Sequence, residues 1–195
     1  MTPSNLTNLL KEISRCTLCT EHLPLGPRPV VRIGPAAKIL VIGQAPGTRV
    51  HASGIPWDDP SGKNLRRWMG VDDPTFYDEN QVAIMPMGFC YPGKGKGGDL
   101  PPRPECAPLW HDKLLHHLPQ IELTLLIGTY AQAKYLGKQR KSNLTETVRA
   151  YREYLPNFLP LVHPSPRNVG WQKNNPWFEK DLIPILQQRC SLLLQ

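Results

Sequence analysis

Two short segments of the sequence combine residue types that could bind a ligand and carry out chemistry on it. The first begins with GQAPG at residues 43–47, whose glycines and proline allow backbone N–H groups to point at a ligand. It continues to GIPWDDPSG at residues 54–62, where Trp57 stands beside Asp58 and Asp59. An aromatic ring offers a base a surface for stacking, which a turn does not need. The alternative interpretation is structural, because these are also ordinary turn and helix-cap residues.

The second segment is HPSPRN at residues 163–168, which joins an imidazole to a rigid Pro-Ser-Pro stretch and an arginine. A histidine with its hydrogen bonds satisfied beside a proline turn is the simpler explanation. Rigid prolines beside a hydroxyl and a guanidinium also suit a wedge that pinches a nucleic-acid backbone. Such a wedge occupies the space that a flipped base leaves.

Four of the five cysteines form a pattern typical of a metal site. Cys16 and Cys19 make a C-x2-C pair, and Cys90 and Cys106 make a C-x15-C pair. In a cytosolic protein such a pattern indicates a metal site before it indicates disulfides. Four thiolates suit zinc or an iron–sulfur cubane equally well, and cysteines without a metal are a third alternative. Cys190 falls outside the pattern and is predicted to lie in the core.

The charge of the chain favours a polyanionic partner. The formal net charge is +7, and basic residues gather in KNLRR (63–67), KGKGG (94–98) and KQRK (138–141). Lysines and arginines that neutralise phosphates release counterions, which stabilises a complex with nucleic acid. Many proteins are mildly basic without binding nucleic acid, so charge alone does not decide the function.

The elements that must position these segments alternate between strand and helix. Apolar, β-branched runs predict strands at 38–43, 81–87, 122–128 and 157–163. Helices are predicted from Ser4 to near Cys16, at 62–69 with Ser61 as N-cap, at 107–118, near 130–136 and from Asn175 onward. The predicted fold is an α/β protein, a three-layer α/β/α sandwich with a central, mainly parallel four-stranded sheet. Sites of such sheets form at the carboxyl ends of the strands, so GQAPG and HPSPRN should face one crevice.

Length and composition are consistent with one domain over residues 1–195. No apolar stretch is long enough for a membrane helix, and the N-terminus has no features of a signal peptide. We therefore expect a cytoplasmic protein without a membrane partner, and a monomer.

Together, the cysteine spacing, GQAPG and HPSPRN resemble the uracil-DNA glycosylase superfamily, in particular its iron–sulfur members, families four and five. The resemblance extends from Cys16 to the last predicted helix, and Asp59-Pro60-Ser61-Gly62 is similar to the D-x-S-G of family five. It implies hydrolysis of the N-glycosidic bond of a deaminated or damaged base in DNA. It also implies a structural 4Fe–4S cluster on the four cysteines, with zinc or no metal as the alternative.

The resemblance also implies roles for individual residues. His163 would donate to a base oxygen, and Asp59 or its neighbour Asp58 would orient water. The residues implied to contact the base are Gly43, Gln44, Ala45, Pro46, Gly47 and the stacking Trp57. Ser165, Pro166, Arg167 and Asn168 of the HPSPRN loop are expected to contact DNA, and Lys63 and Arg66 of the basic run KNLRR are expected to contact its phosphates.

Three positions depart from the pattern of the related enzymes. The iron–sulfur families typically have Glu in place of Gln44, and the best-known uracil enzymes have a water-activating Asp in place of Ala45. Related enzymes often carry a uracil-reading Asn at the end of the second strand, where this chain has Pro86. Two further functions therefore stay open beside the glycosylase: a non-catalytic DNA- or damage-binding protein, and an enzyme acting on a free nucleoside.

Overall fold

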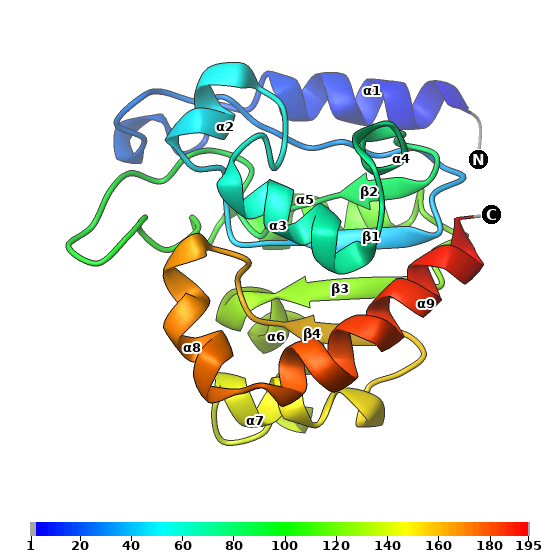
Figure 1. The fold of residues 1–195 in the computed structure, drawn as a ribbon. Helices are drawn as coiled ribbons and strands as arrows, with labels where there is room; N and C mark the ends of the chain where they lie inside the picture. Colours follow the sequence, from blue (N-terminus) through cyan, green and yellow to red (C-terminus); the bar gives the residue numbers. More distant parts are fainter. Residues whose placement is uncertain (1–2, 195) are drawn as a thin grey trace.

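The computed structural model describes residues 3–194 and has an α/β fold built on one four-stranded sheet (Figure 1). The strands are β1 (Ile39–Ile42), β2 (Val82–Ile84), β3 (Leu123–Ile127) and β4 (Phe158–Leu161). They lie in the order β2-β1-β3-β4, and all three pairings are parallel. The strands are apolar along nearly their whole length, as is usual where helices cover both faces of a sheet. The predicted four-stranded sheet is confirmed.

The helices connect and cover these strands. They are α1 (Pro3–Ser14), α2 (Thr48–Ser53), α3 (Pro60–Met69), α4 (Asp73–Tyr77), α5 (Cys106–Leu115), α6 (Gly128–Leu136), α7 (Leu144–Arg149), α8 (Val169–Asn174) and α9 (Ile183–Leu193). Short 3-10 turns are η1 (Thr20–His22), η2 (Gly137–Gln139), η3 (Tyr151–Glu153) and η4 (Pro166–Asn168), and η5 (Phe178–Leu182) is a π-helical turn. Within residues 3–194, no helix is long and apolar enough to cross a membrane.

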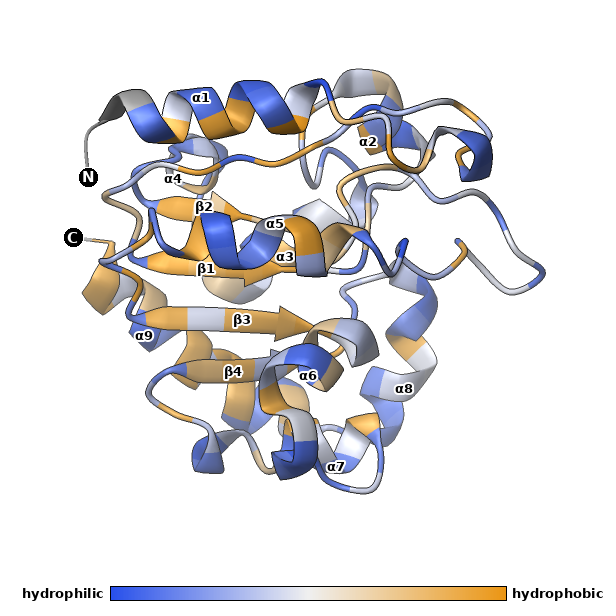
Figure 2. Ribbon diagram, turned by 180° about the vertical axis from the view of Figure 1, so that it is seen from behind, coloured by the Kyte–Doolittle hydropathy of each residue, from blue (hydrophilic) through white to orange (hydrophobic). Residues whose placement is uncertain are grey.

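Side chains of the strands alternate between two hydrophobic cores. Ile39 and Val41 face a core that α3, α7 and α9 close, whereas Leu40 and Ile42 face a second core that α1, α5 and α6 close. Figures 1 and 2 show α3 and α9 on one face of the sheet and α5 and α6 on the other, with α1 turning its hydrophobic stripe inward. This arrangement confirms the three-layer α/β/α sandwich.

The start of α3 differs from the prediction. Ser61 was expected to be the N-cap, but Asp59 takes this position, and its Oδ1 accepts a hydrogen bond from the N–H of Gly62 at 2.8 Å. The helix begins at Pro60, because proline lacks the N–H that the first turn leaves unpaired and its φ already suits a helix. Asp59 is thus fixed to α3 through its side chain.

The C-terminal helix was predicted to start at Asn175, and helical turns do begin two residues later, at Trp177, but the first of them are not α-helical. The chain first forms the π-helical turn η5, and the α-helix α9 begins only at Ile183. Pro184 lies in the first turn of α9 and has no N–H for an α-helical bond to the preceding turn. The expected apolar face is otherwise present, with Phe178, Leu182 and Leu186 buried in the first core.

The order of the strands determines where a ligand can bind. From β1 the chain first moves outward to β2 and then crosses back over β1 to β3 and β4. Between β1 and β3 the direction of winding changes, and loops on either side of such a point leave a crevice at the carboxyl ends of the strands. Residues 43–47 follow β1, Pro86 follows β2 and His163 follows β4.

Candidate functional site

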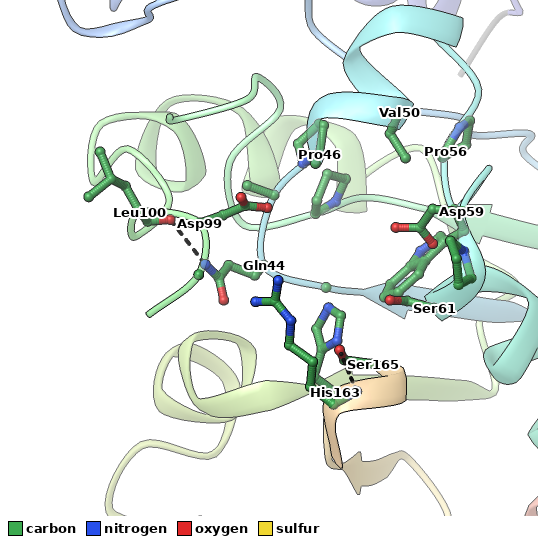
Figure 3. Close-up of a pocket in the computed structure, with 18 of the residues that line it drawn as sticks. Gln44, Pro46, Val50, Pro56, Asp59, Ser61, Asp99, Leu100, His163 and Ser165 are labelled. Carbon is green, nitrogen blue, oxygen red and sulfur yellow. Dashed lines mark hydrogen bonds between the residues drawn. The ribbon is translucent and has the colours of Figure 1, made fainter. Parts of the chain in front are cut away.

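A crevice of about 810 Å³ lies at the carboxyl ends of β1, β2 and β4 (Figure 3). All five residues of GQAPG line it, and so do His163, Ser165, Pro166, Arg167 and Asn168 of HPSPRN. The two loops therefore face one crevice, as the sequence predicted. Trp57, Asp59 and Ser61 complete the lining on the side of α3.

Trp57 forms an aromatic wall of the crevice, and two nearby glycines leave space for it. Its φ is +58°, in the left-handed region that non-glycine residues rarely adopt. A Cβ on Gly43 would lie 2.8 Å from Cζ2 of the Trp57 ring, and a Cβ on Gly62 would lie 1.7 Å from the Trp57 carbonyl oxygen. Both glycines thus leave room for the tryptophan, whose ring lies 5.7 Å from the His163 ring between centroids.

Of the two adjacent acids, only Asp59 lines the crevice. One of its carboxylate oxygens caps α3, and within residues 3–194 the structure gives the side chain no other hydrogen bond. Asp58 is exposed and is not part of the crevice lining. The geometry therefore favours Asp59 over Asp58 as the acid that meets a ligand.

His163 is held in place by its own loop, and its ring faces Asp59 and Asp99. The carbonyl of His163 accepts a hydrogen bond from Nδ2 of Asn168 at 2.7 Å. Burial lowers the pKa of His163 below its ordinary value, although the carboxylates of Asp59 and Asp99 oppose this shift. The imidazole is consequently neutral near pH 7 and can donate one hydrogen bond without carrying charge.

The rest of the HPSPRN loop is rigid because its polar side chains bond to its own backbone. Oγ of Ser165 accepts from the N–H of Arg167 at 3.2 Å, and Nδ2 of Asn64 in α3 donates to the carbonyl of Pro164 at 2.9 Å. Arg167 is exposed at the edge of the crevice, and the structure gives its guanidinium no hydrogen bond within residues 3–194. Ser165 and Asn168 thus shape the loop, and Arg167 is the group free to meet a ligand.

Lys63 and Arg66 lie outside the crevice lining. Lys63 is exposed on the first turn of α3. The Arg66 side chain is only 13% exposed, and its Nε lies 2.6 Å from the Asp73 carboxylate. Its Nη1 also donates to the carbonyl of Trp57 and to the hydroxyl of Tyr77. Arg66 is therefore bonded within the protein and supports the loop that carries Trp57.

A hairpin that sequence analysis treated only as a basic run brings a further acid to the site. Lys94 pairs with Asp99 in an antiparallel bridge, and the N–H of Gly95 donates to the carbonyl of Gly98 at 2.7 Å. Nε2 of Gln44 fastens the hairpin by donating to the carbonyl of Leu100 at 3.0 Å. Asp99 lines the crevice, and in Figure 3 it and Asp59 enter from opposite sides. No motif signalled this acid, because its position depends on how the hairpin folds back.

The four patterned cysteines line one small, mainly apolar cavity away from the crevice. All four are free thiols, and Leu23, Phe89 and Trp110 are among their neighbours. Burial raises the pKa of Cys90 to about 11 and that of Cys106 to about 12, so both are protonated thiols unless a cation binds them. Cys190 lies apart from them in the first core.

The donors around this cavity are of a kind that binds a metal group. Four thiols around one cavity match the ligand set of an iron–sulfur cluster. Among the described residues, no three His, Cys, Asp or Glu side chains lie close enough together to hold one metal ion. A cubane cluster needs its four sulfur ligands further apart than one zinc ion does, because each binds a different iron atom.

One segment, residues 86–90, joins the crevice to the cysteine cavity. The N–H groups of Met87 and Gly88 donate to the carbonyls of Gly43 and Gln44, both at 2.9 Å. The N–H of the next residue, Phe89, donates to Sγ of Cys106 at 3.3 Å. We call residues 86–90 the connecting segment.

A buried histidine holds the first residue of the connecting segment. Nε2 of His111 lies 3.0 Å from the carbonyl of Pro86, and Nδ1 lies 2.7 Å from the hydroxyl of Tyr135. Since a carbonyl only accepts, Nε2 carries the proton and the Tyr135 hydroxyl donates to Nδ1. Burial lowers the pKa of His111 to about 4, so this arrangement persists at neutral pH.

The protein has a parallel α/β sheet with a polar crevice at the point where the strand order reverses. These features define a class of proteins that bind ligands at the carboxyl ends of the strands. A family model narrows this class, because the model described as the uracil DNA glycosylase superfamily matches residues 31–187. The chain belongs to this superfamily. The match includes both crevice loops together with Cys90 and Cys106, whereas Cys16 and Cys19 precede it.

Proposed function

We propose that the protein is a DNA glycosylase that hydrolyses the N-glycosidic bond of a deaminated or damaged base. The observation that supports this most strongly is that Trp57, Asp59 and His163 line one crevice within the matched region. They supply a stacking surface, a carboxylate and a neutral hydrogen-bond donor. The crevice volume of about 810 Å³ is suitable for a ligand the size of a nucleotide.

In the proposed reaction the bond between C1′ of the sugar and the base nitrogen breaks, and its electron pair leaves with the base. The sugar acquires oxocarbenium character, water adds to C1′, and a proton of this water passes to Asp59. His163 donates a hydrogen bond to a base oxygen, where negative charge develops. Both groups therefore act on charge that is larger in the transition state than in the substrate.

The rim of the crevice supplies contacts for a DNA backbone. Lys94 and Lys96 are exposed on the hairpin, Arg167 is exposed on the opposite loop, and Lys63 is exposed at the start of α3. Flipping a base out of the duplex costs a few kcal/mol, which phosphate contacts and the rigid Ser165–Pro166–Arg167 turn would offset. This distribution of charge favours DNA over a free nucleoside as the substrate.

We further propose that Cys16, Cys19, Cys90 and Cys106 hold a 4Fe–4S cluster. When bound, the cluster would crosslink the segment after α1 to the loop between β2 and α5, a structural role. The cysteines would bind it as thiolates, which requires the two buried thiols to lose their protons on assembly.

Protein purified without oxygen should accordingly be brown and contain about four iron atoms per chain, the number in one cubane cluster. Iron and zinc analysis together with the visible absorption spectrum would measure this. Cys106→Ser should lose the colour, whereas Cys190→Ser, which alters a cysteine in the core, should retain it. Anaerobic protein that contains neither iron nor zinc would refute any metal site here.

A non-catalytic damage-binding protein is the second candidate, and two positions favour it. Ala45 and Pro86 both line the crevice and carry no polar side chain. A protein with this site could still hold a flipped base by stacking and backbone contacts, without activating water for its release.

Purified protein mixed with oligonucleotides that contain uracil, hypoxanthine or xanthine should release at least one of these bases. Single- and double-stranded forms, followed by alkali to break abasic sites, would reveal the product. Undamaged oligonucleotides of the same sequence are the control. Retarded but uncleaved damaged oligonucleotides would support the binding protein instead, and hydrolysis confined to free nucleosides would contradict DNA as the substrate.

A further inference from the structure

Several polar side chains of the crevice are already engaged in hydrogen bonds within the protein. Nε2 of Gln44 donates to Leu100, one oxygen of Asp59 caps α3, and Nδ2 of Asn168 donates to His163. Among residues 3–194, the structure gives no hydrogen bond or ion pair to the carboxylate of Asp99. Asp99 is therefore the one carboxylate of the crevice lining, as far as the chain is described, with both oxygens available to a ligand.

The fold holds this carboxylate in a defined place. The hairpin that carries Asp99 is closed by the bridge to Lys94 and by a bond from the N–H of Leu100 to the carbonyl of Gly93 at 2.8 Å. One carboxylate oxygen of Asp99 would lie 3.5 Å from a Cβ placed on Gly47, so it stands directly over the first loop. The hydrogen bond from Gln44 to Leu100 fixes the next residue of the hairpin to the same loop.

The Asp99 carboxylate is a hydrogen-bond acceptor, and several of the groups around it are donors. Its pKa is raised by desolvation, while nearby cations and His163 act in the opposite direction. The titratable groups that interact with it are Arg167, His163, Lys94, Asp59 and Tyr91. Because the neutral His163 ring and Arg167 can donate, the crevice offers a ligand the Asp99 carboxylate as an acceptor together with free donors.

We infer that the Asp99 carboxylate determines base specificity by accepting the ring N–H of a lactam, while a donor across the crevice meets the adjacent carbonyl. This inference rests on the proposed function and names its substrate class. Uracil, hypoxanthine and xanthine all present a ring N–H next to a carbonyl. Cytosine and adenine present a ring nitrogen lone pair next to an amino group, and a carboxylate repels this lone pair. Pro86 cannot supply such an acceptor from its side chain.

The Asp99→Asn variant distinguishes a role of Asp99 in base selection from a role in stabilising the hairpin. An amide offers both a donor and an acceptor, so it can pair with a lactam or with the unprotonated ring nitrogen. The ratio of Kd values for oligonucleotides with the parent base and with the lactam base should fall toward one in this variant. Asp99→Ala should lower kcat/KM on the preferred lactam base by about 10- to 100-fold, the loss expected for a hydrogen bond to a charged group. Asp181→Asn, which alters an exposed acid of η5 outside the crevice lining, is the matched control and should change neither quantity.

The pH dependence gives a second readout. Wild-type preference for the lactam should decline as acid protonates Asp99, and this should begin above the usual pH for an aspartate because the pKa is raised. Asp99→Asn should lack this decline in binding. A selectivity ratio in Asp99→Asn equal to that of the wild type would overturn the inference, even if cleavage persists. A wild type that neither binds nor cleaves any lesion would instead overturn the proposed function itself.

Discussion

Asp59→Asn is expected to lower the rate of base release by about 10² to 10⁴-fold, the usual contribution of a positioned general base. The substitution removes the negative charge that accepts a proton from the attacking water. It keeps the structural role, because asparagine caps a helix as well as aspartate does and can still accept from the N–H of Gly62. Single-turnover rates on the preferred lesion would measure the effect.

The melting temperature of the Asp59→Asn protein should stay close to that of the wild type, and damaged DNA should bind within roughly tenfold, because stacking and phosphate contacts supply most of the affinity. Asp181→Asn is the matched control, because Asp181 is exposed on η5 and lies outside the crevice lining. A full-rate Asp59→Asn enzyme would show that Asp59 serves only as the cap of α3. The water would then depend on Asp58 or on a mechanism without a base.

His163→Ala should cost a factor of about 10² to 10³ in the same rate, as the loss of one oxyanion-hole donor does. The imidazole is neutral because burial lowers its pKa, so it stabilises the departing base by a hydrogen bond and not by a full charge. His163→Gln retains a side-chain N–H and should recover part of the rate. Single-turnover kinetics and Kd should be measured on the same oligonucleotide.

The His163→Ala substitution should lower the single-turnover rate but change the Kd for damaged DNA by roughly tenfold or less, because stacking on Trp57 remains. The His163 ring lies against Trp57, so a thermal melt must accompany the kinetics. A variant that loses affinity and rate in equal measure would contradict a role confined to the transition state.

The strands and both crevice loops could be predicted because their signals are local. Each strand is a short apolar run that ends at a glycine, proline or histidine, and the alternation with helices implies a parallel sheet. Once the sheet is parallel, the ends of β1 and β4 must share one edge. GQAPG and HPSPRN therefore meet for a reason that the sequence contains.

Other features depend on contacts that no local pattern reveals. The helices α2, α4, α7 and α8 have only five or six residues, too few for a periodic signal, although Asp72 and Asn143 cap two of them. Arg66 matched a basic run, yet its partners Asp73 and Tyr77 came within reach only through α4. Asp99 depends in the same way on a bond between Gln44 and a residue 56 positions away.

The connecting segment, residues 86–90, links the cysteine cavity to the first crevice loop and therefore affects how the activity of cysteine variants should be interpreted. Its peptide groups bond to Gly43 and Gln44 at one end and to the sulfur of Cys106 at the other. A disturbance at Cys106 thus has a path of only a few peptide units to the loop that would touch the base. The inactivity of a cysteine variant could then result from a displaced base-binding loop. It would not be evidence that the cysteine site takes part in electron transfer during catalysis.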